Sequence, residues 1–535
     1  MSIRDCAMQS KAFAALKDVY DHRDAEAAKW RAAGKKVIGE LGCDVPDELI
    51  IAAGMLPVQV YADPERPLAE TDKYLEYAFD PAVRAQFEKI VDGTYYDQID
   101  ALAISNSTDV IIRVFLYLRE IHRVEKEKCD FAILTADVPM EIFRAMDIPF
   151  VVNQWWAAIC GAKRMTKKYF GLMQENGYRP DLNSYDAQAL AESFDPDDHK
   201  VDAEGNPMGP WGGLPKPTIC VTRLTGDAQN KIFGLLAENY GADLYTIENT
   251  QARITPLNWY ELAPDRWEEL YDTDRIDLAV EELKELIRYL EMKTGKLFDI
   301  NKLQEVMDLI NEQEGWYRKL RDLIAQCHPV PVTVVDTINA VMQAQWQRGT
   351  RWAADHAKSL YEEVKALADK GEAAVPNEKL RMMWLGRGMW QDFAFYQRFE
   401  QKYGAVFMWS MYLAMGADAY IRNNVEKDPL RALAARFIGM EDFLHMPPWN
   451  SSWFIQQAKQ NDIDGVVYMI PENDMQAVEG SYFIKKVMED AGFPLLAFHA
   501  DPVNPKKWNA ETMTGLVEDF IENRVIPNKE KKQQK

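Results

Sequence analysis

Four polar residues near position 140 combine side-chain types that can do acid–base chemistry. Thr135, Asp137 and Glu141 follow the apolar residues 131–134, and Asn153 follows the next apolar segment. Carboxylate groups can exchange protons with a substrate, and hydroxyl and amide groups can orient it. We therefore take these four residues as the candidate catalytic group. For Glu141 a structural role is also open, because the helix dipole favours a carboxylate in a first helical turn.

Two adjacent tryptophans, Trp155 and Trp156, follow this group and could line an aromatic or thioester-binding pocket. Large aromatic side chains supply much of the apolar surface of such sites. A place in the protein core is the alternative for both residues. Adjacent residues on a helix point in different directions, so the pair cannot line one pocket together.

Arg387 lies between Gly386 and Gly388, after an apolar strand-like segment and before a predicted helix over 389–402. The amides at a helix start can bind phosphate, so Arg387 is a candidate for contacting a coenzyme phosphate. The segment lacks the third glycine of a dinucleotide-binding fingerprint and the lysine of a Walker motif. A tight turn with an exposed arginine is the alternative.

The first of these candidates stand on a pattern of strand, loop, helix and strand over residues 129–160. Pro139 suits the first turn of a helix, where the amide hydrogen that proline lacks would have no partner. Polar loops after parallel strands are the usual ligand sites of open α/β sheets. A second copy of the pattern lies upstream, because 44–52 matches 137–145 at five positions with a constant offset (137 − 44 = 93).

Short apolar segments alternate with helical patterns along the chain. This alternation predicts an α/β protein with several Rossmann- or flavodoxin-like parallel-sheet modules and a helical linker. We divide the chain into four segments, namely 1–127, 128–255, the linker 256–376, and 377–535. Two helices are expected over 265–326, where apolar residues recur at helical spacing with glutamate and lysine between them. Residues 71–90 are also expected to be helical.

The composition limits the classes of partner and cofactor. A net charge of −22 argues against nucleic acid as a partner, because the phosphate backbone attracts basic surfaces. No continuous apolar run is long enough to span a membrane, and the first residues lack the apolar core of a signal peptide. We therefore expect a cytoplasmic protein. The six cysteines form no C-x-x-C pair and no zinc-finger spacing.

The order of several motifs resembles the 2-hydroxyacyl-CoA dehydratase and benzoyl-CoA reductase family. Residues 129–525 resemble a nearly complete larger subunit, through ADVPMEIFRAMDIPF, NGYRPDLNSYDAQ, TGKLFDINKL, LGRGMW, GAVFMWSMY, DGVV and GFPLLAFHAD. Residues 34–120 resemble the front of the smaller subunit, through GKKVIG, VPDELIIAAGMLPV and YYDQIDALAISNSTD. The resemblance covers most of the chain, with the front module as an addition.

This resemblance implies a subunit of a heteromeric enzyme of anaerobic metabolism that binds an acyl-CoA or aryl-CoA thioester. Similar proteins are lyases that dehydrate a 2-hydroxyacyl-CoA through a ketyl radical, or oxidoreductases that reduce the ring of an aryl-CoA. Their paired subunits each hold a [4Fe–4S] cluster, and an ATP-dependent activator supplies electrons. The implied partners of this chain are a second family subunit and such an activator.

The chain departs from the family pattern at the cysteines that would hold iron. Asn183 and Asn473 stand where two of them are expected, and the segment 225–227 occupies the place of a third. Neutral amides and hydroxyls are poor ligands for an iron–sulfur cluster, so we expect the [4Fe–4S] cluster in a partner subunit. The remaining candidate iron ligands in this chain are Cys43, Cys160 and Cys220.

Three functions are open at this point. The first is a CoA-thioester-binding subunit of such a dehydratase or reductase, with a substrate-binding set of Trp155, Trp156, Asn183, Arg387 and Asn473. The second is a scaffold or regulatory subunit without a cluster. The third is a lyase or transferase that works without a cluster and uses the polar residues for acid–base chemistry.

Overall fold

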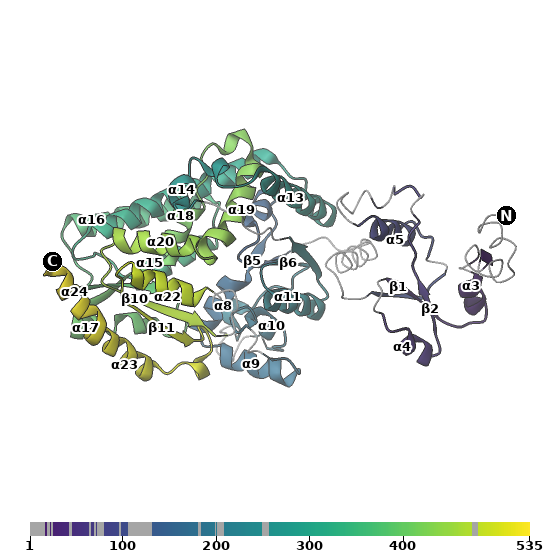
Figure 1. Cartoon of the computed structure of the whole chain (residues 1–535), viewed down its shortest axis with the longest axis horizontal. Helices are drawn as coiled ribbons and strands as arrows, with labels where there is room; N and C mark the ends of the chain where they lie inside the picture. Colours follow the sequence, from purple (N-terminus) through teal and green to yellow (C-terminus); the bar gives the residue numbers. More distant parts are fainter. Residues whose placement is uncertain are drawn as a thin grey trace, which may run out of the picture. The chain divides into compact units, whose positions relative to one another are not determined.

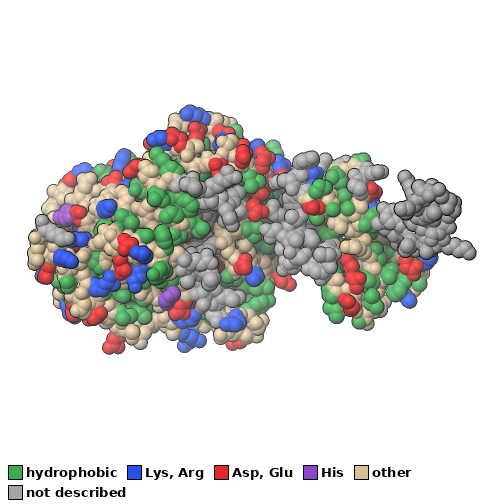
Figure 2. All heavy atoms as spheres, viewed as in Figure 1, with side chains coloured by type: hydrophobic (Ala, Val, Ile, Leu, Met, Phe, Trp, Pro, Cys, Tyr) green, Lys and Arg blue, Asp and Glu red, His purple; other side chains and the backbone are tan. Residues whose placement is uncertain are grey.

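The computed structural model shows two compact units, unit 1 (residues 1–127) and unit 2 (residues 128–535) (Figure 1). The structure describes residues 17–18, 22, 25–41, 45–63, 66–68, 71, 80–95, 98–104, 131–179, 183–197, 200, 208–248, 256–472 and 480–534. None of the helices in these ranges has both the length and the apolar character needed to cross a lipid bilayer. Figure 2 shows acidic and basic side chains interspersed over the visible face of unit 2.

Unit 1 contains a three-stranded parallel sheet with the strand order β2–β1–β3. Its strands are β1 (Val37–Leu41), β2 (Leu56–Gln59) and β3 (Ala101–Ile104), and its helices are α3 (Ala25–Ala32), α4 (Asp47–Ala52) and α5 (Pro81–Val91). The Asp80 carboxylate accepts hydrogen bonds from the amides of Ala82 and Val83 and so caps α5. The predicted helix over 71–90 therefore begins at Pro81, and residues 72–79 lie outside the described ranges.

Unit 2 contains a first parallel sheet with the strand order β5–β4–β6–β7. Its strands are β4 (Ala132–Leu134), β5 (Phe150–Val152), β6 (Ile219–Arg223) and β7 (Asp243–Ile247). The helices of this part are α7 (Met140–Ala145), α8 (Asn153–Ala162), α9 (Thr166–Glu175), α10 (Gln188–Glu192) and α11 (Asp227–Tyr240) (Figure 1). The two central strands are fully buried, as expected for a parallel sheet with helices on both faces.

The second parallel sheet of unit 2 has the strand order β11–β10–β8–β9. Its strands are β8 (Leu380–Leu385), β9 (Ala405–Ser410), β10 (Gly465–Pro471) and β11 (Leu495–Ala500). The helices beside it are α17 (Glu400–Tyr403), α22 (Ser481–Asp490), α23 (Ala510–Phe520) and α24 (Ile526–Gln533). Three parallel sheets flanked by helices confirm the predicted α/β class.

The predicted helix over 389–402 is wrong. This segment forms a turn, a short 3₁₀ helix η4 (Phe393–Gln397) and the one-turn helix α17. The Tyr396 ring packs edge to face against Trp384 at a centroid distance of 4.9 Å, and Phe395 packs the same way against Phe399 at 5.4 Å. Burial of these aromatic rings against the second sheet therefore outweighs the local preference for a regular helix.

A helical region joins the two sheets of unit 2. Its helices are α12 (Trp259–Leu262), α13 (Thr273–Thr294), α14 (Ile300–Gln326), α15 (Val334–Gln345) and α16 (Arg351–Asp369). Three further helices, between β9 and β10, are α18 (Met411–Ala419), α19 (Pro429–His445) and α20 (Trp449–Gln460). Helix α14 packs along α16 and also contacts α7 and α18 (Figure 1). The two helices expected over 265–326 are present as α13 and α14, whereas α18 to α20 lie outside every predicted helix. The four-segment division of the chain stays a prediction.

The repeated sequence pattern is also a repeated structure. Helices α4 and α7 correspond residue for residue at the offset of 93, and each begins six residues after the last residue of the preceding strand. Strand β1 lies between β2 and β3, as β4 lies between β5 and β6. The two copies therefore share one topology, each within its own unit.

Candidate functional site

A cavity of about 200 Å³ opens in unit 2, where the carboxyl ends of both sheets meet the helical region. Residues that follow strands of the first sheet contribute Ala136, Asp137, Gln154, Trp155 and Gln229. Residues at or after strand ends of the second sheet contribute Gly386, Arg387, Met411, Tyr412 and Pro471. The helical region adds Met342, Gln345, Arg348, Tyr420 and Met440. Open α/β sheets bind their ligands at this edge, so the cavity is the candidate site.

Asp137 accepts hydrogen bonds from three side chains at this cavity. The Thr135 hydroxyl donates to the carboxylate, the Thr225 hydroxyl donates over 2.7 Å, and the Gln229 amide donates to the same oxygen over 3.4 Å. Thr135 is fully buried, so it orients Asp137 and does not line the cavity. Three donors from three segments fix the direction of one carboxylate.

Gln154 extends this hydrogen-bond network. Its amide oxygen accepts the backbone amide of Ala136 at 2.8 Å, and its amide nitrogen donates to Asp186 at 2.7 Å and to Gln229 at 3.2 Å. Asp186 also accepts a hydrogen bond from the Asn183 side chain. Asn183 is therefore connected to the cavity through Asp186 and Gln154, although its own side chain is not among those that line it.

The two adjacent tryptophans have different surroundings, as the helical geometry requires. Trp155 lines the cavity and packs edge to face against Trp346, with ring centroids 5.7 Å apart. Trp156 is buried in a separate core of the first sheet, where its indole nitrogen donates to Glu192. Trp155 is thus placed to contact a ligand, and Trp156 is a core residue.

Glu141 and Asn153 make buried contacts beside the first sheet and do not line the cavity. Glu141, in the first turn of α7, forms a 3.0 Å ion pair with Arg436 of α19, and both side chains are buried. Asn153 is fully buried and donates to the backbone oxygen of Asp186 over 2.9 Å. Among the four residues taken as catalytic from the sequence, only Asp137 borders the cavity.

Arg387 lies in a tight turn after β8 and lines the cavity. Its guanidinium packs over the Tyr185 ring, with 4.6 Å from the guanidinium carbon to the ring centroid. Gly386 has a φ of 94°, and a Cβ atom there would come within 2.0 Å of the Met469 backbone oxygen, so the turn requires glycine. No helix begins at Gly388, so the expected phosphate site at a helix start is absent from this described segment.

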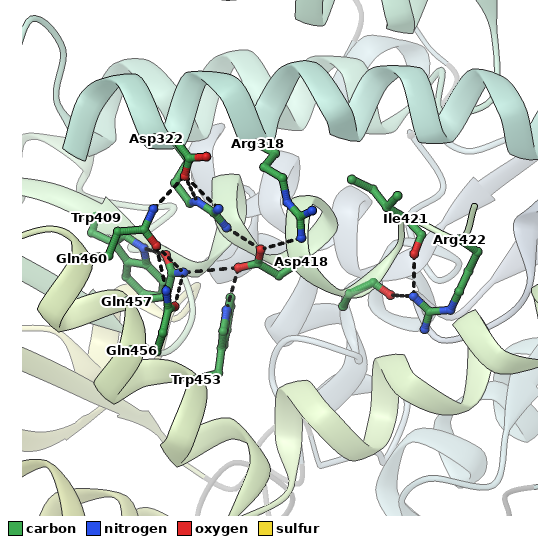
Figure 3. Close-up of polar contacts among 12 residues, drawn as sticks. Arg318, Asp322, Trp409, Asp418, Ile421, Arg422, Trp453, Gln456, Gln457 and Gln460 are labelled. Atoms are coloured by element: carbon green, nitrogen blue, oxygen red, sulfur yellow. Dashed lines mark hydrogen bonds and ion pairs between the residues drawn. The ribbon is translucent and has the colours of Figure 1, made fainter. Parts of the chain in front are cut away.

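A buried aspartate fixes the helix that carries part of the cavity wall (Figure 3). Asp418 of α18 accepts hydrogen bonds from Trp453 at 2.8 Å and Gln457 at 3.3 Å, both on α20. The guanidiniums of Arg318 and Arg321, on α14, lie 3.3 and 2.5 Å from its other oxygen. Figure 3 shows Arg318, Trp453 and Gln457 pointing toward Asp418. Helix α18, which Asp418 holds in place, also carries three residues that line the cavity, Met411, Tyr412 and Met415.

Arg348 brings a buried positive charge to the cavity wall. Its guanidinium lies 3.2 Å from the Glu314 carboxylate and 4.5 Å from the centroid of the Tyr420 ring. Burial raises the pKa of Glu314, and the guanidiniums of Arg348 and Arg436 oppose this shift. Each member of the Arg348–Glu314 pair needs the other as a counter-ion, because both are almost fully buried.

The described residues do not fit a metal ion or an iron–sulfur cluster. No group of three or more His, Cys, Asp or Glu side chains converges within these ranges. Cys160 and Cys220 are fully buried in an apolar core with Ile133 and Phe233 and do not line the cavity. Cys43 lies outside the described residues.

The positions where the family resemblance predicts cysteines carry hydrogen-bonding side chains instead. The Asn183 side chain donates to Asp186, and the Thr225 hydroxyl donates to Asp137. The network thus connects both positions beside the cavity. Asn473, at the third position, lies outside the described residues.

Sequence patterns alone did not single out four residues that line the cavity, Gln154, Gln229, Arg348 and Tyr412. Three of them lie shortly after a parallel strand: Gln154 follows β5, Tyr412 follows β9, and Gln229 is in the first turn of α11 after β6. This position at the ligand-binding edge is a signal that could have found them. Arg348 lies between α15 and α16, where no local pattern marks it.

Comparison with known proteins relates this chain to a described protein family. A family model named 2-hydroxyglutaryl-CoA dehydratase, D-component, matches residues 135–523, more than half of the 535 residues. The chain is 24% identical over 258 residues to the (R)-2-hydroxyisocaproyl-CoA dehydratase alpha subunit of Clostridioides difficile. This match covers 47% of this chain and 62% of that protein.

Two further relatives match over shorter stretches. The (R)-phenyllactyl-CoA dehydratase alpha subunit of Clostridium sporogenes is 32% identical over 129 residues, which is 24% of this chain and 31% of that protein. The (R)-2-hydroxyglutaryl-CoA dehydratase beta subunit of Acidaminococcus fermentans is 35% identical over 75 residues, which is 14% of this chain and 20% of that protein. The matches span less than two thirds of the length of each of these three relatives.

Proposed function

The chain belongs to the 2-hydroxyglutaryl-CoA dehydratase D-component family, and we propose that it is the CoA-thioester-binding subunit of a 2-hydroxyacyl-CoA dehydratase-like complex. A second family subunit is the proposed partner, because the relatives include alpha and beta subunits. The names of the relatives favour dehydration over reduction of an aromatic ring. The role of an ATP-dependent activator rests on the family resemblance.

The observation that carries this proposal is the composition of the cavity. Its apolar lining is largely aromatic or sulfur-containing, and includes Trp155, Met342, Met411, Met415, Met440 and Phe454. Such a wall binds an acyl chain by removing apolar surface from water. Methionine side chains adapt to irregular shapes, which suits a pocket for a branched or aromatic group.

Polar groups at the strand ends would hold the thioester. Burial raises the pKa of Tyr412 to about 12, so its phenol stays protonated at neutral pH and can donate a hydrogen bond. Gln154 and Gln229 carry amide groups at the same cavity. A thioester carbonyl accepts such bonds, which fix its position and stabilise negative charge on its oxygen. Asp137 holds the Gln229 amide, so we assign Asp137 an orienting role.

We place the [4Fe–4S] cluster of the family in the partner subunit. Asn183 and Thr225 cannot replace thiolate ligands, and the described cysteines do not reach the cavity. No step of the proposal therefore passes through a cluster bound to this chain. Iron and acid-labile sulfide analysis of the anaerobically purified chain tests this assignment. We expect neither in stoichiometric amount, and one full cluster per chain would contradict it.

Isothermal titration calorimetry with 3-phenylpropanoyl-CoA and with free CoA tests whether the chain binds a CoA thioester. We expect the thioester to bind about tenfold or more tightly than CoA, because the phenyl chain is buried in the cavity. Met415→Glu should remove this preference, since Met415 lines the cavity. Met292→Glu is the matched control, because Met292 is 47% exposed on α13.

The same titration separates the alternatives. Equal affinity for CoA and for the thioester would show that the cavity does not hold the acyl group. Absence of binding by either compound would favour a scaffold or regulatory subunit. Turnover of a 2-hydroxyacyl-CoA by the iron-free chain alone would favour a lyase or transferase that works without a cluster.

A further inference from the structure

One ion pair at the cavity wall has only its positively charged member in the lining. Arg348 lines the cavity, whereas its partner Glu314, on α14, lies behind it and does not. The two charged groups are 3.2 Å apart, and their side chains are 2% and 1% exposed. A positive charge at the wall is thus matched by a negative charge out of reach of a ligand.

The packing around Glu314 keeps its carboxylate beside Arg348. A Cβ atom at Gly416 of α18 would come within 2.1 Å of a Glu314 carboxylate oxygen, so α18 packs directly against this group. On its cavity side, Arg348 also packs over the Tyr420 ring. The guanidinium is therefore engaged by Glu314 and by Tyr420.

The wall around Arg348 on the side of the helical region is mostly apolar, and the uncharged amides of Gln345 and Asn450 also border the cavity there. The apolar residues that these helices contribute are Met342, Met415, Met440, Leu444 and Phe454. The other lining residues that can carry a charge near neutral pH are Asp137 and Arg387, which follow strand ends, and His445, the last residue of α19. Asp137 accepts three hydrogen bonds, and Arg387 packs over Tyr185.

We propose that the cavity selects acyl chains without a charged end group, and that Glu314 is the positioning residue that sets this selectivity by neutralising Arg348. This inference rests on the proposed function. A carboxylate at the end of an acyl chain would lose its hydration among these methionine side chains, where the nearby cation, Arg348, is already paired with Glu314. A branched aliphatic or phenyl chain loses only apolar hydration there, which is favourable.

Titration calorimetry at pH 8 with three thioesters tests this inference. The probes are 4-methylpentanoyl-CoA, 3-phenylpropanoyl-CoA and glutaryl-CoA, which differ in the chain end. We expect the wild-type chain to bind the two neutral thioesters about tenfold or more tightly than glutaryl-CoA. Glu314→Gln removes the carboxylate that pairs with Arg348, and should raise the affinity for glutaryl-CoA about tenfold while the neutral thioesters change less than about threefold.

Two variants control for indirect effects. Glu312→Gln makes the same substitution on the same helix, but Glu312 is surface-exposed and pairs with Arg351 at 2.8 Å, so selectivity should not change. The double variant Glu314→Gln/Arg348→Gln removes both charges and should lose the gain for glutaryl-CoA. Circular dichroism checks that each variant is folded, and the wild-type preference provides a test that needs no variant.

The outcomes separate the inference from the proposed function. If all three thioesters bind no better than CoA, the proposed function fails and the inference fails with it. If they bind well but glutaryl-CoA binds as tightly as the neutral thioesters, only the inference is overturned. A folded Glu314→Gln variant with unchanged selectivity would also overturn it, and so would a gain for glutaryl-CoA that persists in the double variant.

Discussion

The two copies of the strand–loop–helix pattern differ in what covers their helices. In unit 2, α7 is buried, with Ile142 at 0% and Glu141 at 6% exposure, and α14 packs against it. In unit 1, the corresponding helix α4 exposes Leu49 at 69% and Ile51 at 60%. The same short motif is therefore part of the core in one unit and a surface helix in the other.

This difference shows that the motif alone does not make a site. In unit 2, Arg436 reaches α7 from a distant helix and pairs with Glu141. Residues after β6 hold the Asp137 carboxylate of the loop. The loop borders a cavity because the second sheet and the helical region close around it. The candidate site thus depends on the elements that pack against the motif. Substitutions in the two copies can test this difference in packing.

The largest effect is expected for Arg436→Met. The variant leaves Glu141 buried without its counter-ion, which should lower the free energy of unfolding of unit 2 by about 3–5 kcal/mol. Urea unfolding followed by circular dichroism measures this change. Glu48→Gln, at the exposed counterpart of Glu141 in α4, is the control and should leave unfolding unchanged. Similar effects of the two substitutions would mean that the two helices are covered alike.

Ile142→Ala should have the next largest effect. It removes a fully buried side chain of α7 and should cost about 2–4 kcal/mol of stability. Leu49→Ala makes the equivalent change in α4, where the side chain is exposed, and should leave the unfolding midpoint unchanged within error. A comparable loss in both variants would contradict the contrast between the units.

Asp137→Ala should weaken thioester binding about 10- to 100-fold, because Thr225 and Gln229 lose the acceptor that orients them. Titration with 3-phenylpropanoyl-CoA measures the loss. Asp44→Ala is the matched control, since Asp44 is the sequence counterpart of Asp137 in unit 1 at the offset of 93. Unchanged affinity in the Asp137 variant would remove Asp137 from the site.

The smallest effect concerns Glu40 of unit 1, whose counterpart in unit 2 is the apolar Ile133 (133 − 40 = 93). Burial, and then the neighbouring Asp47, raise the pKa of Glu40 to about 7. A pKa that is higher in the folded state stabilises the fold at low pH, and this contribution is lost as the pH rises through 7. Glu40→Gln should therefore stabilise unit 1 at pH 8 relative to the wild type by about 1–2 kcal/mol, with little difference at pH 4. Thermal unfolding of both proteins at pH 8 and pH 4 measures the difference in stability. The same difference at both pH values would contradict the raised pKa of Glu40.

Much of the fold could be predicted because its strands are short apolar runs. The strand, loop, helix and strand predicted over 129–160 are present as β4, residues 135–139, α7 and β5. The segment 389–402 shows where this reasoning fails. Its aromatic residues are compatible with a helix, but Phe395 and Tyr396 are buried against the second sheet in a tighter conformation. Local pattern cannot reveal a tertiary contact of this kind.

The site was predictable only where its residues follow strand ends. Asp137, Trp155 and Arg387 reach the cavity for that reason. Trp156 and Asn153 do not, because the direction of a side chain from α8 depends on how the helix packs. The Arg348–Glu314 pair joins segments that no motif connects, so only the folded structure shows it.

We propose that the acyl group of a CoA thioester occupies the cavity between the two sheets of unit 2. A crystal structure of the chain with 3-phenylpropanoyl-CoA tests it most directly. We expect the phenyl group in contact with Trp155, Met411 and Met415, with the thioester at the strand ends near Gln154 and Tyr412. A phenyl group outside this cavity, or an iron–sulfur cluster beside Asn183, would contradict this placement of the acyl group.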